Sequence, residues 1–139
     1  MNSVVHFELP VEDRDRASEF YSQAFGWKAN KMDEKMGSYT VVQTAETDAA
    51  GMIQEPGRIN GGLYMKTKED QFPTVVIAVD DINEAMEKVK SAGGKILGGS
   101  FAPDKPDDIP GVGKYIAVRD TEGNRIALLQ PNATMEVHA

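Results

Sequence analysis

Few side chains in this sequence could do chemistry, and the most notable are His6 and Glu8. The chain has no cysteine, so thiol catalysis, thiolate metal sites and disulfide bonds are excluded. His6 and Glu8 are two positions apart, a spacing that places both side chains on one face of a β-strand. An imidazole beside a carboxylate can contact a polar ligand, act as a general base, or offer two donors to a metal ion.

A metal centre needs more donors than this pair supplies. A divalent ion acting as a Lewis acid takes about three protein ligands and keeps one open position. The second of the two histidines, His138, lies in a short tail that follows Gln130. We therefore predict no metal site and no cofactor.

The charge of the chain excludes some classes of partner. With 15 basic and 22 acidic residues, its formal charge is −7, which repels phosphate backbones and anionic lipids. The first eight residues lack the charged and apolar regions of a signal peptide, and no apolar run is long enough to span a bilayer. We expect a cytoplasmic protein that binds neither nucleic acid nor membranes.

An internal repeat organises the chain. A shift of 68 positions carries the stretch 6–28 onto 74–96 without a gap. It aligns an alternating apolar pattern, an aspartate suited to a helix N-cap (Asp13 and Asp81), an apolar helical stripe and a terminal glycine. We interpret this as a duplicated supersecondary unit.

Each copy predicts a strand, a helix and three further strands. The helical stripe of the first copy comprises Ala17, Phe20, Tyr21, Ala24 and Phe25. Of these, Phe20 and Phe25 are assigned to core packing, together with Trp27. The stripe of the second copy comprises Ile82, Ala85, Met86 and Val89. The later strands are predicted at 27–31, 39–44 and 59–66, and at 95–97, 115–119 and 125–130, with a hairpin turn at 120–124. The fold class is therefore α+β, with two tandem βαβββ modules.

We expect one domain, in which 1–68 forms the first module, 69–131 the second and 132–139 a C-terminal tail. Two loops, 45–58 and the proline-containing 100–113, interrupt the pattern. Each loop either borders a binding site or is a plain surface connection. The glycine pairs at 61–62, 93–94 and 98–99 indicate turns, bulges or close backbone packing.

A tandem βαβββ pair resembles the vicinal oxygen chelate superfamily, which includes glyoxalase I, bleomycin-resistance proteins and extradiol dioxygenases. The likeness rests on three segments that span most of the chain: His6–Trp27, Val79–Lys95 and Pro110–Asn124. It is greatest to an uncharacterised, glyoxalase-related branch. The resemblance implies sheets curved round a shared cleft, and a homodimer, because relatives commonly dimerise.

The resemblance also implies where a metal would bind. Metal-dependent members place one ligand on the first strand and one on the last strand of each module. His6 retains the first of these positions, whereas Thr74 and Ala127 occupy two others. The fourth lies within 60–65, which holds no carboxylate or imidazole. His6 is then a relict that bonds Glu8 or a tyrosine, a polar contact to a ligand, or a general base, and we favour the first two.

Strand parity predicts the residues that face the cleft. Thr74, Val76, Ala127 and Leu129 share the face of His6 and Glu8, and three tyrosines are added as candidates. We expect a small, partly aromatic organic ligand without a metal; the alternative is a divalent-metal lyase or dioxygenase with a rebuilt ligand set. The predicted ligand-binding residues are His6, Glu8, Tyr39, Tyr64, Thr74, Tyr115 and Ala127.

Overall fold

The structure is a computed structural model of the chain, and it describes residues 1–32 and 38–132. The chain divides into two compact units, residues 6–73 and residues 74–139 together with 1–5. We call them the first and second module and describe each by itself. His138 and positions 133–139 of the predicted tail lie outside the described residues.

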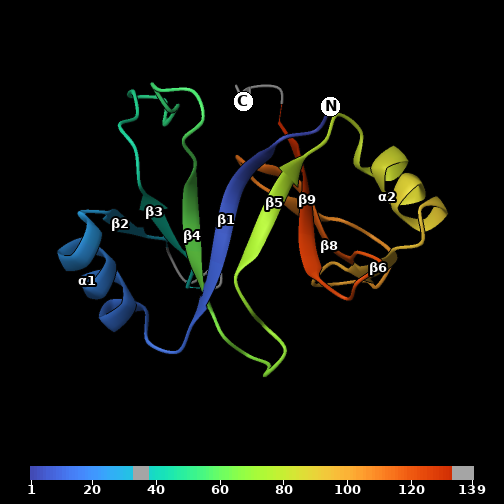
Figure 1. Cartoon of the computed structure of the whole chain (residues 1–139), viewed down its shortest axis with the longest axis horizontal. Coiled ribbons are helices and arrows are strands. Elements are labelled where there is room, and N and C mark those ends of the chain that lie inside the picture. Colours follow the sequence, from blue (N-terminus) through green and yellow to red (C-terminus); the bar gives the residue numbers. More distant parts are fainter. Residues whose placement is uncertain (33–37, 133–139) are drawn as a thin grey trace. The chain divides into compact units, whose positions relative to one another are not determined.

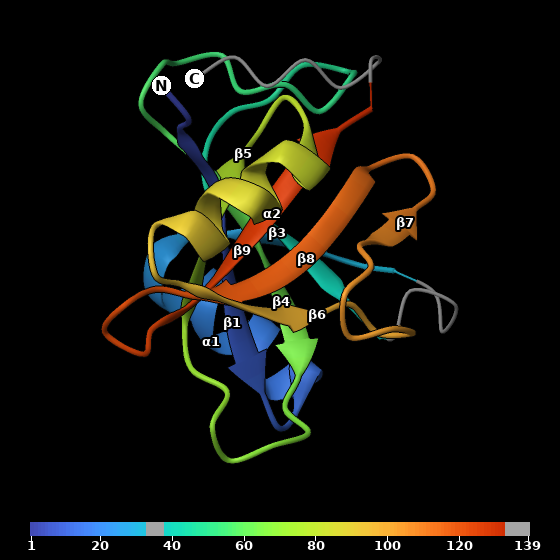
Figure 2. The same cartoon turned by 90° about the vertical axis from the view of Figure 1, so that its right-hand side faces the viewer.

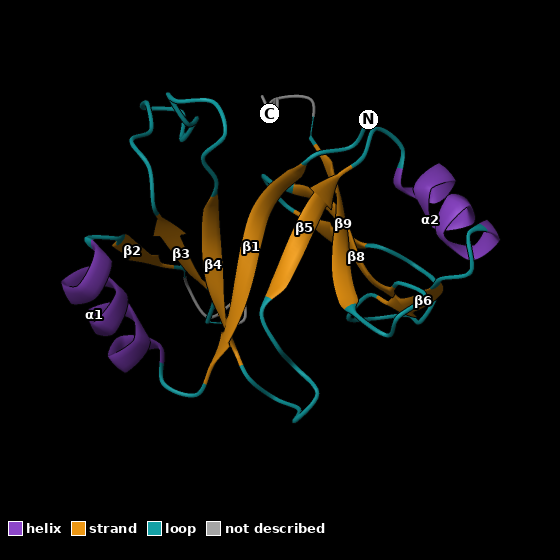
Figure 3. Ribbon diagram, viewed as in Figure 1, coloured by secondary structure: helices purple, strands orange, loops and turns teal. Residues whose placement is uncertain are grey.

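The first module has the predicted βαβββ order, shown in blue to green in Figure 1. Its elements are β1 (Val4–Val11), α1 (Arg14–Phe25), β2 (Lys28–Lys31), β3 (Thr40–Gln43) and β4 (Asn60–Met65). The first two residues of β1 belong to the second module. β1 pairs in parallel with β4, and β3 pairs antiparallel with both β4 and β2. Figure 3 shows α1 beside β2, on the side of the first-module strands that lies farthest from β1.

The second module repeats this order with one extra strand. Its elements are β5 (Thr74–Ala78), α2 (Ile82–Ser91), β6 (Lys95–Gly98), β7 (Asp107–Ile109), β8 (Gly113–Arg119) and β9 (Arg125–Pro131). β5 pairs in parallel with β9, as β1 does with β4, while β9, β6 and β7 all pair antiparallel with β8. β7 was predicted as loop, so that part of the prediction is wrong: three residues of the proline-containing segment pair with Gly113–Tyr115.

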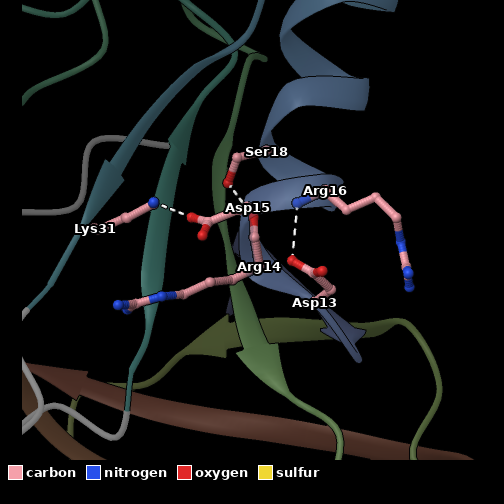
Figure 4. Close-up of polar contacts among 6 residues, drawn as sticks. All are labelled: Asp13, Arg14, Asp15, Arg16, Ser18 and Lys31. Carbon is pink, nitrogen blue, oxygen red and sulfur yellow. Dashed lines mark hydrogen bonds and ion pairs between the residues drawn. The ribbon is translucent and has the colours of Figure 1, made fainter.

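The helix caps confirm the signals read from the repeat. The Asp13 carboxylate accepts a hydrogen bond from the Arg16 backbone N–H at 3.0 Å, and the Asp81 carboxylate accepts from Asn83 and Glu84. Figure 4 shows the start of α1, where an ion pair between Asp15 and Lys31 also joins the helix to β2. The hydrogen bond from Lys31 lowers the pKa of the Asp15 carboxyl.

The core of the second module lies under α2, which crosses the face of β8 and β9 in Figure 2. Ile82 and Met86 of the helix are buried against strand residues, and Ala85 and Val89 pack beside them. This is the predicted stripe. Burying such side chains supplies most of the stability of a helix of this length.

The stripe of α1 is not buried as predicted. Phe20 is 56 % exposed and Phe25 64 %, and no residue of this helix is fully buried. The aromatic side chains instead form a cluster in which Tyr21 stacks on Trp27 with ring centroids 4.7 Å apart. Phe20 meets the ring of Tyr21 edge-on and Phe25 lies tilted against it, and both keep part of their surface in solvent. The assignment of these two phenylalanines to the core is therefore wrong.

Candidate functional site

The face of the first-module sheet that points away from α1 is polar. Phe7 packs on Trp27 of the helix side, with ring centroids 5.5 Å apart, so the neighbouring His6 and Glu8 project from the opposite face. Glu8 is only 8 % exposed. Tyr64, the register partner of Pro10 on β4, belongs to the same face. The strand parity inferred from the sequence thus describes this module correctly.

Tyr39 directly engages His6. The Nε2 atom of His6 and the Tyr39 hydroxyl oxygen are 3.0 Å apart, a hydrogen bond between residues 33 positions apart in the chain. Burial lowers the pKa of His6, and the charge of Glu8 acts in the opposite direction. The imidazole is therefore neutral at physiological pH, and its Nε2 is occupied by the tyrosine.

Gly62 explains how Tyr39 reaches this position. Gly62 is the register partner of Glu8 and is buried. A Cβ atom built on Gly62 would overlap the hydroxyl and the adjacent ring carbon of Tyr39. The neighbouring Gly61 has the matching role on the opposite face, where a Cβ would overlap the ring of Phe7. The two glycines thus leave room for one aromatic ring on each face of β4.

The corresponding face of the second module is apolar. Val76, Ala127 and Leu129 form a buried cluster there, with Val112 and Tyr115 packed against it. Thr74 is buried two positions before Val76 on the same strand. The structure therefore brings the predicted site residues Tyr115 and Ala127 into one cluster, with Thr74 on the same strand face.

The register also locates the position that the sequence left open. In the second module, Ala127 is the register partner of Val76. The repeat places Val76 at the position of Glu8, and the register partner of Glu8 is Gly62. Gly62 is therefore the first-module counterpart of Ala127. Sequence reasoning missed it because it assigned this glycine only to a turn, bulge or close packing. A glycine pair inside a strand pattern was the available signal.

The described residues do not fit a divalent metal ion. Of the four positions that the resemblance assigns to metal ligands, only that of His6 holds a metal-binding residue, and its Nε2 is bonded to Tyr39. Gly62, Thr74 and Ala127 offer no imidazole or carboxylate. Within residues 1–32 and 38–132, no three His, Cys, Asp or Glu side chains gather closely enough to hold a metal ion.

A separate open groove of about 380 Å³ lies on the helix side of the first module. Its lining comes from the end of β1 and the first turns of α1, including Val11, Arg16 and Phe20. It is not part of the face that carries His6.

Among the residues that the structure describes, neither helix is long and apolar enough to cross a membrane.

The curated relatives of this chain have glyoxalase-type names. A Vibrio cholerae protein named "Probable lactoylglutathione lyase" is 28% identical over 129 residues, which cover 91% of this chain and 89% of that one. A "Glyoxylase-like domain-containing protein" of Didymella fabae is 30% identical, covering 87% and 88%. A candidate glyoxylase of Mycobacterium tuberculosis, CFP32, is 26% identical over 89% of this chain but only 42% of its own length. This chain thus spans less than half of the mycobacterial relative.

Solved structures share the fold. A methylmalonyl-CoA epimerase in complex with methylmalonyl-CoA superposes with a TM-score of 0.69, covering 98% of this chain and 99% of that one at 16% identity. The epimerase from Mycobacterium tuberculosis gives a TM-score of 0.63 at 16% identity, covering 93% and 87%. The model of one protein family matches residues 3–128, nearly the whole chain. The chain therefore belongs to the glyoxalase/bleomycin resistance protein/dioxygenase superfamily.

Proposed function

We propose that this protein binds a small, partly aromatic organic molecule and uses no metal ion to do so. The observation that carries the proposal is the hydrogen bond between His6 and Tyr39. The one retained metal-ligand position already has a protein partner, and the counterpart positions hold glycine, threonine and alanine. A face of this kind recognises a ligand through hydrogen bonds and apolar contact rather than by chelation.

The first module supplies the polar contacts in this proposal. His6 and Tyr39 together offer a hydrogen-bond donor and acceptor, and Glu8 adds a carboxylate on the same face. Tyr64 adds an aromatic ring with a hydroxyl group. Thr74, Tyr115 and Ala127 of the second module remain predicted ligand-binding residues, and Tyr115 and Ala127 belong to the buried apolar cluster of that module.

The competing function is a divalent-metal lyase or dioxygenase. The name of the Vibrio cholerae relative favours it, as does the retention of His6. Such an enzyme would have to add at least one further ligand to His6 and Glu8, and Tyr39 would have to release Nε2.

Elemental analysis of protein purified without chelators or a metal-affinity tag separates the two functions. The proposal expects no bound Ni, Zn, Fe or Mn in wild type or in His6→Ala, with His138→Ala as the matched control. About one ion per chain in wild type and in the His138→Ala control, lost in His6→Ala, would refute the proposal and support the metal-dependent function.

Ligand binding is tested next by thermal-shift screening of small aromatic compounds. A compound that raises the Tm of wild type should lose most of its effect in Tyr39→Phe and Glu8→Gln. Tyr21→Phe is the control, because it removes a hydroxyl from the helix side of the same module. Equal shifts in all four proteins would place the ligand elsewhere.

A further inference from the structure

We infer that Tyr39 takes the place of a metal ion in the first module, filling the space of a ligand side chain and occupying the Nε2 lone pair of His6. The inference deepens the proposed function and rests on it. It assigns to Tyr39 and Gly62 a joint role that neither residue type indicates alone.

The space argument comes from the strand register. Gly62 stands where the last strand of the module would carry a ligand, since it matches Ala127 of the second module. The Tyr39 hydroxyl lies where a Cβ on Gly62 would be, so a side chain at 62 and the present position of Tyr39 exclude each other. Tyr39, which directly precedes β3, therefore fills the space that a side chain at position 62 of β4 would need.

The lone-pair argument comes from the chemistry of imidazole. A neutral histidine carries one ring N–H and one lone pair, and a metal ion binds at the lone pair. A phenol is the stronger hydrogen-bond donor of this pair and an imidazole nitrogen the stronger acceptor, so we assign the Tyr39 O–H as the donor to Nε2. The tyrosine proton and a metal ion would thus compete for the same lone pair, 3.0 Å from the hydroxyl oxygen.

Burial strengthens this competition. His6 lies beside the buried Glu8, in surroundings where an unsatisfied polar atom is costly. A metal ion entering the module would have to break the hydrogen bond and displace the ring before it gained its first ligand. Tyr39 is therefore a positioning residue, which keeps the His6 ring turned toward a protein partner and its Nε2 atom engaged.

The test uses Zn²⁺ alone as the probe, in a His138→Gln background where His6 is the remaining imidazole. Ring ¹H–¹⁵N correlations report the state of Nε2 directly. We expect Zn²⁺ to leave the His6 signals unmoved when Tyr39 is present, and also in the control Tyr21→Phe. In Tyr39→Phe the lone pair is free, and the same Zn²⁺ concentration should move the signals.

A second variant restores the ligand position. Tyr39→Ala combined with Gly62→Glu frees the space and places a carboxylate opposite Glu8, so His6 and two carboxylates share one face. This variant should retain about one Zn²⁺ per chain after desalting, whereas the background retains none. Should it not fold, as judged from its amide spectrum, Tyr39→Phe decides alone.

The results separate the two proposals. Signals that stay unmoved in Tyr39→Phe, or that move as readily in the background, would overturn the inference while leaving a metal-free function standing. Metal in the untreated wild-type chain would overturn the proposed function itself.

Discussion

Replacing Thr40 with valine should make the protein more stable. Thr40 is completely buried in β3, and its hydroxyl oxygen has no hydrogen-bond partner among the described residues. It is the register partner of the fully buried Leu63 on β4 and of Lys31 on β2, on the side of the sheet that carries α1. Valine has nearly the same shape, suits a strand equally well and brings no polar atom into this position.

The magnitude follows from the cost of an unsatisfied hydroxyl. A buried polar group without a partner costs about 1–3 kcal/mol, and the swap removes that group without opening a cavity. We expect a gain of about 1 kcal/mol in the free energy of unfolding. For a chain of this length that is a rise of roughly 3–5 °C in Tm.

Urea denaturation followed by circular dichroism measures the effect, with an unchanged m-value as the sign that the same surface unfolds. Thr44→Val is the matched control, because the Thr44 hydroxyl donates to the Ile59 carbonyl. That variant should lose about 1 kcal/mol. If Thr40→Val is destabilised as much as Thr44→Val, the Thr40 hydroxyl has a partner in solution and the reasoning is wrong.

Three further predictions concern other parts of the molecule. Burial lowers the pKa of His6 from 6.5, so as the pH falls the imidazole binds a proton more readily in the unfolded chain than in the folded one. The free energy of unfolding should therefore decline below about pH 6.5, by at most about 1.4 kcal/mol per pH unit. Denaturation across pH 5–8 should show this slope in wild type and a flatter one in His6→Gln; parallel curves would argue against a buried neutral imidazole. Gly61→Ala should cost about 1–3 kcal/mol, since the new Cβ meets the ring of Phe7, and an unchanged urea midpoint would show that the ring can move. Ile82→Ala should cost about 2–5 kcal/mol and the exposed Phe25→Ala about 1 kcal/mol or less; calorimetry giving the reverse order would contradict the burial described for the two helices.

The sequence was sufficient to predict what depends on local pattern. The repeat offset, the caps at Asp13 and Asp81, and the parity of β1 follow from residue types at fixed spacing, and each is confirmed. The glycine pair at 98–99 was assigned to a turn, a bulge or close backbone packing, and the register of β6 against β8 shifts there. Local signals of this kind are independent of distant partners.

What escaped prediction depends on contacts between distant residues. The helical spacing of Phe20 and Phe25 predicts a buried stripe, yet it is Tyr21 of this helix that stacks on Trp27, while Phe20 and Phe25 stay exposed. β7 forms because β8 offers it an open edge, which its own sequence does not reveal. The relation between Gly62 and Tyr39 requires the register of β3 on β4, so residue spacing alone could not show it.

In each module a loop joins the last two strands, and the two loops differ greatly in length. In the second module, β8 and β9 are joined by the turn at 120–124, where the Asp120 N–H donates to the Asn124 carbonyl. In the first module, residues 44–59 separate β3 from β4. Because closing a longer loop costs more chain entropy and slows pairing, we expect the β8–β9 hairpin to form early in refolding. Amides of 113–131 should then gain protection from hydrogen exchange before those of 40–65. The two halves of the repeat would thus form their last strand pair at different times, the C-terminal half first.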